Sequence, residues 1–160
     1  MTHPSLGRPP RQAALAWAEI AKRIRDSAPQ LAARALAVAI DRDPTLRERY
    51  DEIGLRERLR DAELLAEQIA TAVAEGNPEH TGDYADWTST VYRRKQVPLD
   101  DLANLCEGLR AAIGGAFPPA VADLTNQAID AAVAEYRWHR RLAGDARKRN
   151  AFLQFIYKGG

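Results

Sequence analysis

The chain has 160 residues, of which 46% are apolar and 28% charged, and its formal net charge is +1. This composition excludes a disordered chain and indicates one globular domain, which at this length buries roughly 68–70% of its extended-chain surface. A single cysteine, Cys106, excludes an intramolecular disulfide framework, and no Cys/His cluster has zinc-finger spacing. The polar residues 1–10 lack the apolar stretch of a secretory signal, and no run of about 18 apolar residues predicts a transmembrane helix. We therefore expect a cytoplasmic protein whose residues 1–10 are flexible.

Helix is the secondary structure that the sequence favours throughout. Alanine accounts for 30 residues, and apolar residues recur every three or four positions. We predict an all-α domain over residues 11–143, built as a globin-like or up-down bundle of about six to seven helices. The first helix follows Pro10 and is interrupted at Ser27, where a second begins. Asp43 and Pro44 combine an N-cap residue with proline at the first helical position, which predicts a short helix ending near Ile53.

Four longer helices follow, and glycine and proline mark their boundaries. We expect them after Gly54, from Asn77 and Pro78 to Lys95, from Pro98, and from Pro118 to about Leu142. Gly76, the pair Gly114 and Gly115, and Gly144 are expected to end three of them. No segment alternates as a strand does, and no glycine-rich phosphate-binding motif is present, so a mixed α/β enzyme fold is disfavoured.

Charge is unevenly distributed along the chain. Residues 51–90 contain three Arg against ten Asp and Glu, whereas residues 136–160 contain seven Arg and Lys against one Asp. A basic end of this kind could meet nucleic acid, anionic lipid, an acidic protein or the acidic segment of a second copy, or it could be a solvated surface. We expect a protein partner, a larger assembly or a homodimer, and no specific nucleic acid.

Three residues in the helix after Pro78 are candidates for a ligand pocket. Tyr84, Trp87 and Val91 recur at spacings of three and four, which places them on one face of that helix. Aromatic side chains combine a large apolar area with a polar tip and could line a pocket for an apolar or planar molecule. Packing in the core is the alternative for the same stripe.

Cofactor chemistry would depend on few residues. His80 or His139 could donate to a haem, a bilin or a metal, Cys106 could be an attachment point, and Glu135 could share a metal with His139. The chain lacks the Glu-x-x-His motif of di-iron bundles, His80 lies in the first turn of its helix, and Cys106 lies in an apolar stripe. We therefore expect no catalytic residue and no cofactor, and a haem, bilin or metal sensor is the alternative.

Residues 144–160 form a basic and aromatic tail. Arg147, Lys148 and Arg149 precede a run of apolar residues. That run contains Phe152, Leu153, Phe155, Ile156 and Tyr157. A terminal segment as apolar as this either folds back onto its domain or docks on a partner, as a helix, an added strand or an interfacial anchor.

Several short motifs between residues 42 and 142 resemble those of a known family. They are Asp43 with Pro44, Arg49 with Tyr50, Asp83 with Tyr84, Trp87, Arg93 with Arg94, Val97 with Pro98 and Leu99, Leu102, and Phe117 with Pro118 and Pro119. Together they resemble the N-terminal helical sensory domain of RsbR-type stressosome co-antagonists and the helical domain that precedes some cobalamin-binding regulators.

The resemblance implies a non-haem globin-like bundle that reports a signal through dimer or interdomain contacts, without catalytic residues. No STAS domain and no Asp-x-His-x-x-Gly cobalamin signature follows in this chain. We therefore expect a stand-alone, non-enzymatic bacterial regulator or adaptor whose output depends on complex formation, with its tail as the candidate docking element and a small apolar ligand as a further option.

Overall fold

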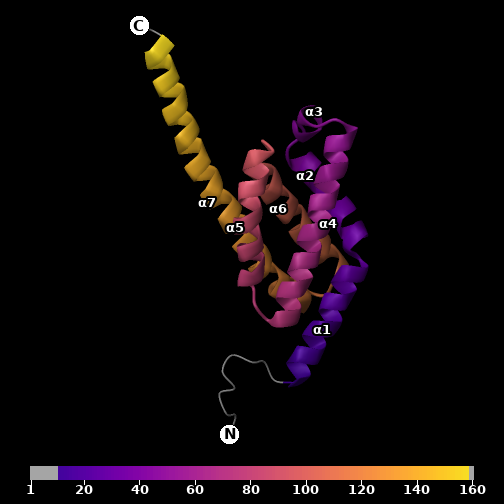
Figure 1. Cartoon of the computed structure of the whole chain (residues 1–160). Coiled ribbons are helices and arrows are strands. Elements are labelled where there is room, and N and C mark those ends of the chain that lie inside the picture. Colours follow the sequence, from indigo (N-terminus) through magenta and orange to yellow (C-terminus); the bar gives the residue numbers. More distant parts are fainter. Residues whose placement is uncertain (1–10, 159–160) are drawn as a thin grey trace, which may run out of the picture.

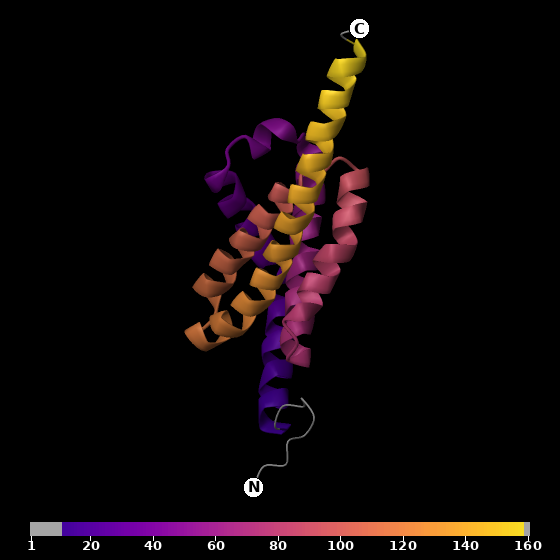
Figure 2. The same ribbon diagram turned by 90° about the vertical axis from the view of Figure 1, so that its left-hand side faces the viewer.

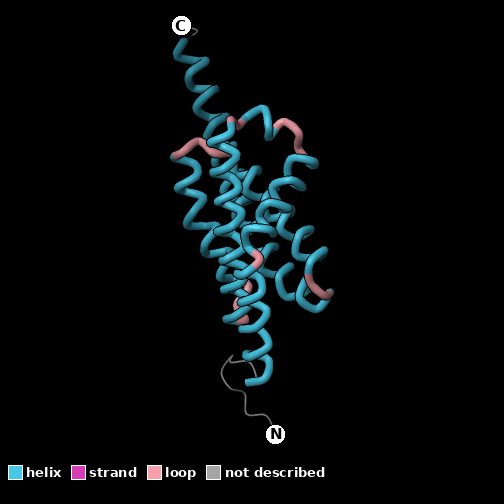
Figure 3. Tube along the Cα trace, turned by 90° about the vertical axis from the view of Figure 1, so that its right-hand side faces the viewer, coloured by secondary structure: helices cyan, strands magenta, loops and turns pink. Residues whose placement is uncertain are grey.

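The computed structural model describes residues 11–158, and the side chains of residues 12–142. This part of the chain forms seven helices (Figure 1) and no strand (Figure 3). The helices are α1 (Arg11–Asp26), α2 (Ala28–Arg42), α3 (Leu46–Arg49), α4 (Glu52–Glu75), α5 (Glu79–Arg94), α6 (Leu99–Ala116) and α7 (Pro119–Lys158). The predicted all-α bundle of six to seven helices is confirmed. The expected flexible residues 1–10 lie outside the described part.

The last four helices of the bundle, α4 to α7, alternate in direction along its long axis (Figure 1). Figure 2 shows α7 lying between α5 and α6, and both helices pack against it. On its other side α6 packs against α2, while α4 packs against α1 and α2. None of the described helices is both long and apolar enough to cross a lipid bilayer.

Small residues set how closely the helices approach. Much of the core consists of alanines, including Ala32, Ala35 and Ala39 on the face of α2 that is fully buried. Gly108 on α6 lies against that face, and a Cβ there would come within 2.2 Å of the Ala35 carbonyl oxygen. The contact between α2 and α6 therefore requires glycine for space, at a helical position where glycine is otherwise unfavourable.

Two of the predicted boundaries near the short helix were wrong. The expected helix to Ile53 is the single turn α3, and the chain is extended at Tyr50. The next helix does not begin after Gly54 but at Glu52, because the side chain of Asp51 accepts a hydrogen bond of 2.7 Å from the Gly54 backbone nitrogen and caps α4.

Glycine ends one helix as predicted but not two others. Gly76 adopts φ 63° after α4, the left-handed conformation that a helix end favours. By contrast α6 continues past Gly114 and Gly115 to Ala116, and α7 passes Gly144 and reaches Lys158. A glycine inside a helix costs only about 1 kcal/mol relative to alanine, so good helix formers on both sides carry the helix through it. The predicted separate tail is therefore the continuation of α7.

Two glycines of α6 provide a matched test of the close packing between α2 and α6. Gly108→Ala should lower the free energy of unfolding by about 1–3 kcal/mol, because its methyl group overlaps backbone atoms of α2. Gly114→Ala should raise it by about 0.5–1 kcal/mol, since a Cβ there meets no atom within 4 Å and alanine favours helix. Urea denaturation of both variants measures the difference, and equal effects would contradict the close approach of α2 and α6.

Candidate functional site

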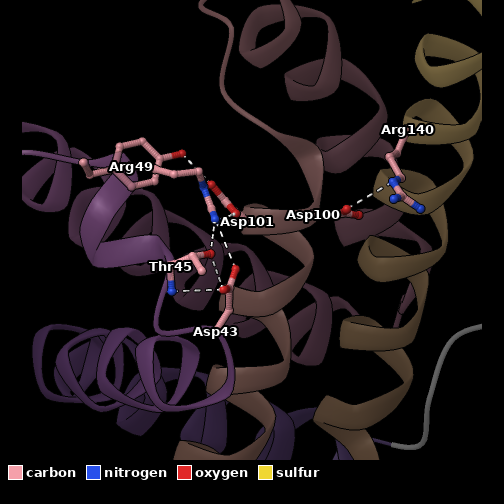
Figure 4. A network of polar contacts seen from close by, with 7 residues as sticks. Asp43, Thr45, Arg49, Asp100, Asp101 and Arg140 are labelled. Carbon is pink, nitrogen blue, oxygen red and sulfur yellow. Dashed lines mark hydrogen bonds and ion pairs between the residues drawn. The ribbon is translucent and has the colours of Figure 1, made fainter. Parts of the chain in front are cut away.

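The most distinctive group of polar contacts lies where α7 leaves the bundle. His139 Nε2 is 2.7 Å from Asp86 Oδ1 on α5 and 3.8 Å from Glu135 Oε2, one turn earlier on α7. The next residue, Arg140, forms an ion pair through Nε with Asp100 Oδ2 of α6 at 3.0 Å (Figure 4). Consecutive residues of α7 thus contact both neighbouring helices before the helix projects beyond them.

The group Asp86, Glu135 and His139 brings together atoms that could bind a metal ion. One ligand atom from each residue lies within 4.8 Å of the other two. The sequence identified the pair Glu135 and His139 through their helical spacing but missed Asp86, which belongs to another helix. No local spacing links Asp86 to the pair; the parallel packing of α5 beside α7 brings it there.

A second polar group is buried at the start of α6. Asp101 is 1% exposed, and its carboxylate accepts hydrogen bonds of 2.6 Å from both Arg49 Nη2 and the Tyr50 hydroxyl (Figure 4). Arg49 also bonds Asp43, whose Oδ1 accepts from the backbone nitrogen of Thr45. Hydrogen bonds from Thr45 and Arg49 hold the pKa of Asp43 below its usual value. Residues of two motifs behind the family resemblance therefore hold α3 against α6.

Arg58 extends this buried polar group along α4. It is 3% exposed, its guanidinium lies 5.0 Å from the centre of the Tyr50 ring, and its Nε is 2.8 Å from Asp61 Oδ2. The other oxygen of Asp61 accepts a hydrogen bond of 2.8 Å from the Tyr92 hydroxyl. Among the described side chains no buried polar atom lacks a hydrogen-bond partner. These contacts are satisfied internally, and they hold α3, α4, α5 and α6 together.

The three predicted pocket residues do not share one environment. Trp87 is 66% exposed, whereas Tyr84 and Val91 are partly buried. A hollow of about 360 Å³ lies between α2 and α6, and none of the three lines it. The core-packing alternative is therefore wrong for Trp87.

The face that α5 buries carries smaller and more polar residues than the sequence suggested. They are Thr81, Gly82, Ala85, Thr88, Ser89 and Tyr92. Thr88 and Ser89 can be buried because their hydroxyls donate to backbone carbonyls one turn earlier, and Thr88 Oγ1 also lies 3.1 Å from the fully buried Tyr136 hydroxyl. Periodicity of large apolar residues alone therefore selected a neighbouring face, on which Tyr84 packs against the core and Trp87 is exposed.

The remaining candidates have ordinary structural surroundings. His80 Nε2 is 2.7 Å from Gln68 Oε1 on α4, away from the group around His139. Cys106 is buried in the core, and burial raises the pKa of its thiol to about 12, which fits a small buried hydrophobe. The predicted docking side chains lie outside those that the structure describes, although their backbone is helical. They are Arg147, Lys148, Arg149, Phe152, Leu153, Phe155, Ile156 and Tyr157.

The chain matches no model of a known protein family and no curated protein. The resemblance to RsbR-type sensory domains therefore depends on the sequence motifs alone. Within those motifs, Asp43, Arg49 and Tyr50 have a structural role in the contact with Asp101.

The contact between Tyr50 and Asp101 predicts a loss of stability in alkali. Burial, together with the neighbouring carboxylate, raises the pKa of Tyr50 to about 12, whereas an unfolded tyrosine has a pKa of about 10. The neutral phenol thus stabilises the fold fully below pH 10, and this contribution is lost as the pH rises toward 12. Urea denaturation across this window should show a smaller loss for Tyr50→Phe than for the unchanged protein, and equal losses would contradict this role.

The exposure of Trp87 predicts a mild effect of its removal. Trp87→Ala should change the free energy of unfolding by no more than about 0.5 kcal/mol, as is usual for surface substitutions. Tyr136→Ala is the comparison, because this ring is fully buried and its loss should cost about 3–5 kcal/mol. A large loss of unfolding free energy in Trp87→Ala, measured by chemical denaturation, would show that Trp87 packs in the core.

Proposed function

We propose that this protein is a non-enzymatic regulator or adaptor, a globin-like sensory bundle that acts by docking on a protein through the projecting end of α7. One observation supports this most: α7 continues as a helix to Lys158, well beyond the other helices (Figure 1). An isolated helix is marginal in water, so a partner that packs against the projecting end of α7 would stabilise it.

Exposed apolar residues at the base of the projection support the same proposal. Trp138 is 53% exposed and Leu142 is 46% exposed, and their spacing of four places them on one side of α7. Arg141 lies beside them, its guanidinium 5.8 Å from a ring centre of Trp138. Tryptophan and arginine are the residue types that most often dominate binding at protein interfaces.

Charge favours a second copy of the chain as the partner. The basic residues 136–160 and the acidic residues 51–90 would attract one another between two molecules. A homodimer of this kind also agrees with the signalling by dimer contacts that the resemblance to RsbR-type domains implies. The resemblance also suggests a bacterial source, and the single cysteine suits the reducing cytoplasm.

Sedimentation velocity of the full chain, a variant lacking residues 146–160 and a Trp138→Gln, Leu142→Gln double variant tests this proposal. We expect the full chain to form a dimer and the truncated chain to be monomeric with its bundle still helical by circular dichroism. The dissociation constant of the dimer should be roughly 30-fold higher for the double variant, because the loss of one interface hot spot costs about 2 kcal/mol or more.

The matched control is Leu15→Gln. Leu15 is 65% exposed and lies on α1, outside both the basic residues 136–160 and the acidic residues 51–90, so its replacement removes a comparable exposed apolar side chain from another surface. This variant should associate as the unchanged chain does. A chain that stays monomeric at all concentrations, or equal association of the double variant and the full chain, would contradict docking through α7.

A further inference from the structure

In the group Asp86, Glu135 and His139, the histidine lies beside two carboxylates, one more than an ion pair requires. His139 Nε2 and Asp86 Oδ1, 2.7 Å apart, already make a complete pair between α7 and α5. A second carboxylate nevertheless approaches the same nitrogen, with Glu135 Oε2 at 3.8 Å. Within the described residues, the ion pairs of Asp86 and Glu135 both go to His139, and no lysine or arginine pairs with either carboxylate. Two carboxylates therefore share one imidazole, which leaves the group with excess negative charge.

We propose that these three residues bind one divalent transition-metal ion of the zinc type, a site independent of the docking function proposed above. Imidazole nitrogen with carboxylate oxygens is a donor set that suits Zn²⁺, whereas Ca²⁺ and Mg²⁺ take oxygen ligands. Three protein ligands leave the remaining positions to water. The two carboxylates balance the double positive charge of the ion, so no further protein group is needed.

The geometry is close to that which the ion requires. Ligand atoms about 2.0–2.1 Å from a tetrahedral zinc ion lie about 3.3 Å from one another. The distances of 2.7 and 3.8 Å from His139 Nε2 fall on either side of this value. Asp86 is 63% exposed and Glu135 38% exposed at the side chain, whereas His139 is only 15% exposed. The less exposed imidazole thus sets the position of the ion. The two more exposed carboxylates, whose oxygens lie within 4.8 Å of each other, must each shift by roughly half an ångström or more to reach tetrahedral spacing.

The position of the site gives the ion a structural consequence. Glu135 and His139 belong to α7 and Asp86 to α5, so a bound ion would link the two helices just before α7 leaves the bundle. Because the ion binds the folded arrangement and not the unfolded chain, it should raise the temperature of unfolding.

The test uses the full chain without an affinity tag, with His3→Gln in every protein so that the N-terminal imidazole cannot contribute. Isothermal titration with Zn²⁺ should show one saturable site, and Zn²⁺ should raise the midpoint of thermal unfolding. His139→Gln and Glu135→Gln should each weaken binding by more than the ~10–100-fold that the loss of an outer-shell partner costs. Co²⁺ should give a visible band that the same variants lose.

His80→Gln is the matched control. His80 lies on α5 with Glu75 at 3.7 Å, so it is also a histidine beside a carboxylate, but it lacks a second acidic partner. This variant should bind Zn²⁺ as the reference chain does. If the reference chain shows no saturable binding, the three residues form an ion pair only and the proposal is wrong. It is also wrong if Glu135→Gln, an exposed change that leaves the fold intact, binds as tightly as the reference.

Discussion

A buried carboxylate at the start of α6 constrains the whole upper end of the bundle. Asp101 is 1% exposed, and a charge at that depth destabilises the fold unless it is paired. Arg49 and Tyr50 provide the pairing, and the single turn α3 brings both of them to it. Removing one partner of a buried pair costs about 3–5 kcal/mol, less here because Arg49 is partly exposed. The length and position of α3 thus follow from the need to satisfy one side chain.

The adjacent residue connects the same turn of α6 to α7. Asp100 points away from Asp101 and pairs with Arg140, so consecutive aspartates bind elements on opposite sides of α6 (Figure 4). The two contacts differ in energy. The exposed pair with Arg140 contributes at most about 1 kcal/mol, whereas the buried one is needed for stability. The outer contact therefore directs α7 without making the fold depend on it.

Local signals predicted the helices well, because alanine content and capping residues act over a few neighbouring positions. These local signals failed where contacts between helices determine the structure. Gly144 was expected to end α7 as Gly76 ends α4, yet only Gly76, which Pro78 follows, adopts the left-handed conformation that ends a helix. Trp87 looked like core because it is large and apolar, whereas Thr88 is buried because its hydroxyl is satisfied by the backbone and Tyr136. Two of the three residues of the candidate metal site, Glu135 and His139, could be predicted because they lie four positions apart on one helix. Asp86 could not, because it lies on another helix.

The two proposals meet at one turn of α7. A protein that docked on the projecting end would exert its force on the helix, and among the described side chains the contacts nearest to that end are His139 with Asp86 and Arg140 with Asp100. Both are partly exposed ion pairs, which break and re-form at little cost. Behind them the helix is held by the fully buried Ile129, Tyr136 and their neighbours, where any shift would open cavities or create overlap. Movement of the projection should therefore be absorbed at residues 139 and 140, and an ion that holds His139 against Asp86 would stiffen the joint at that place.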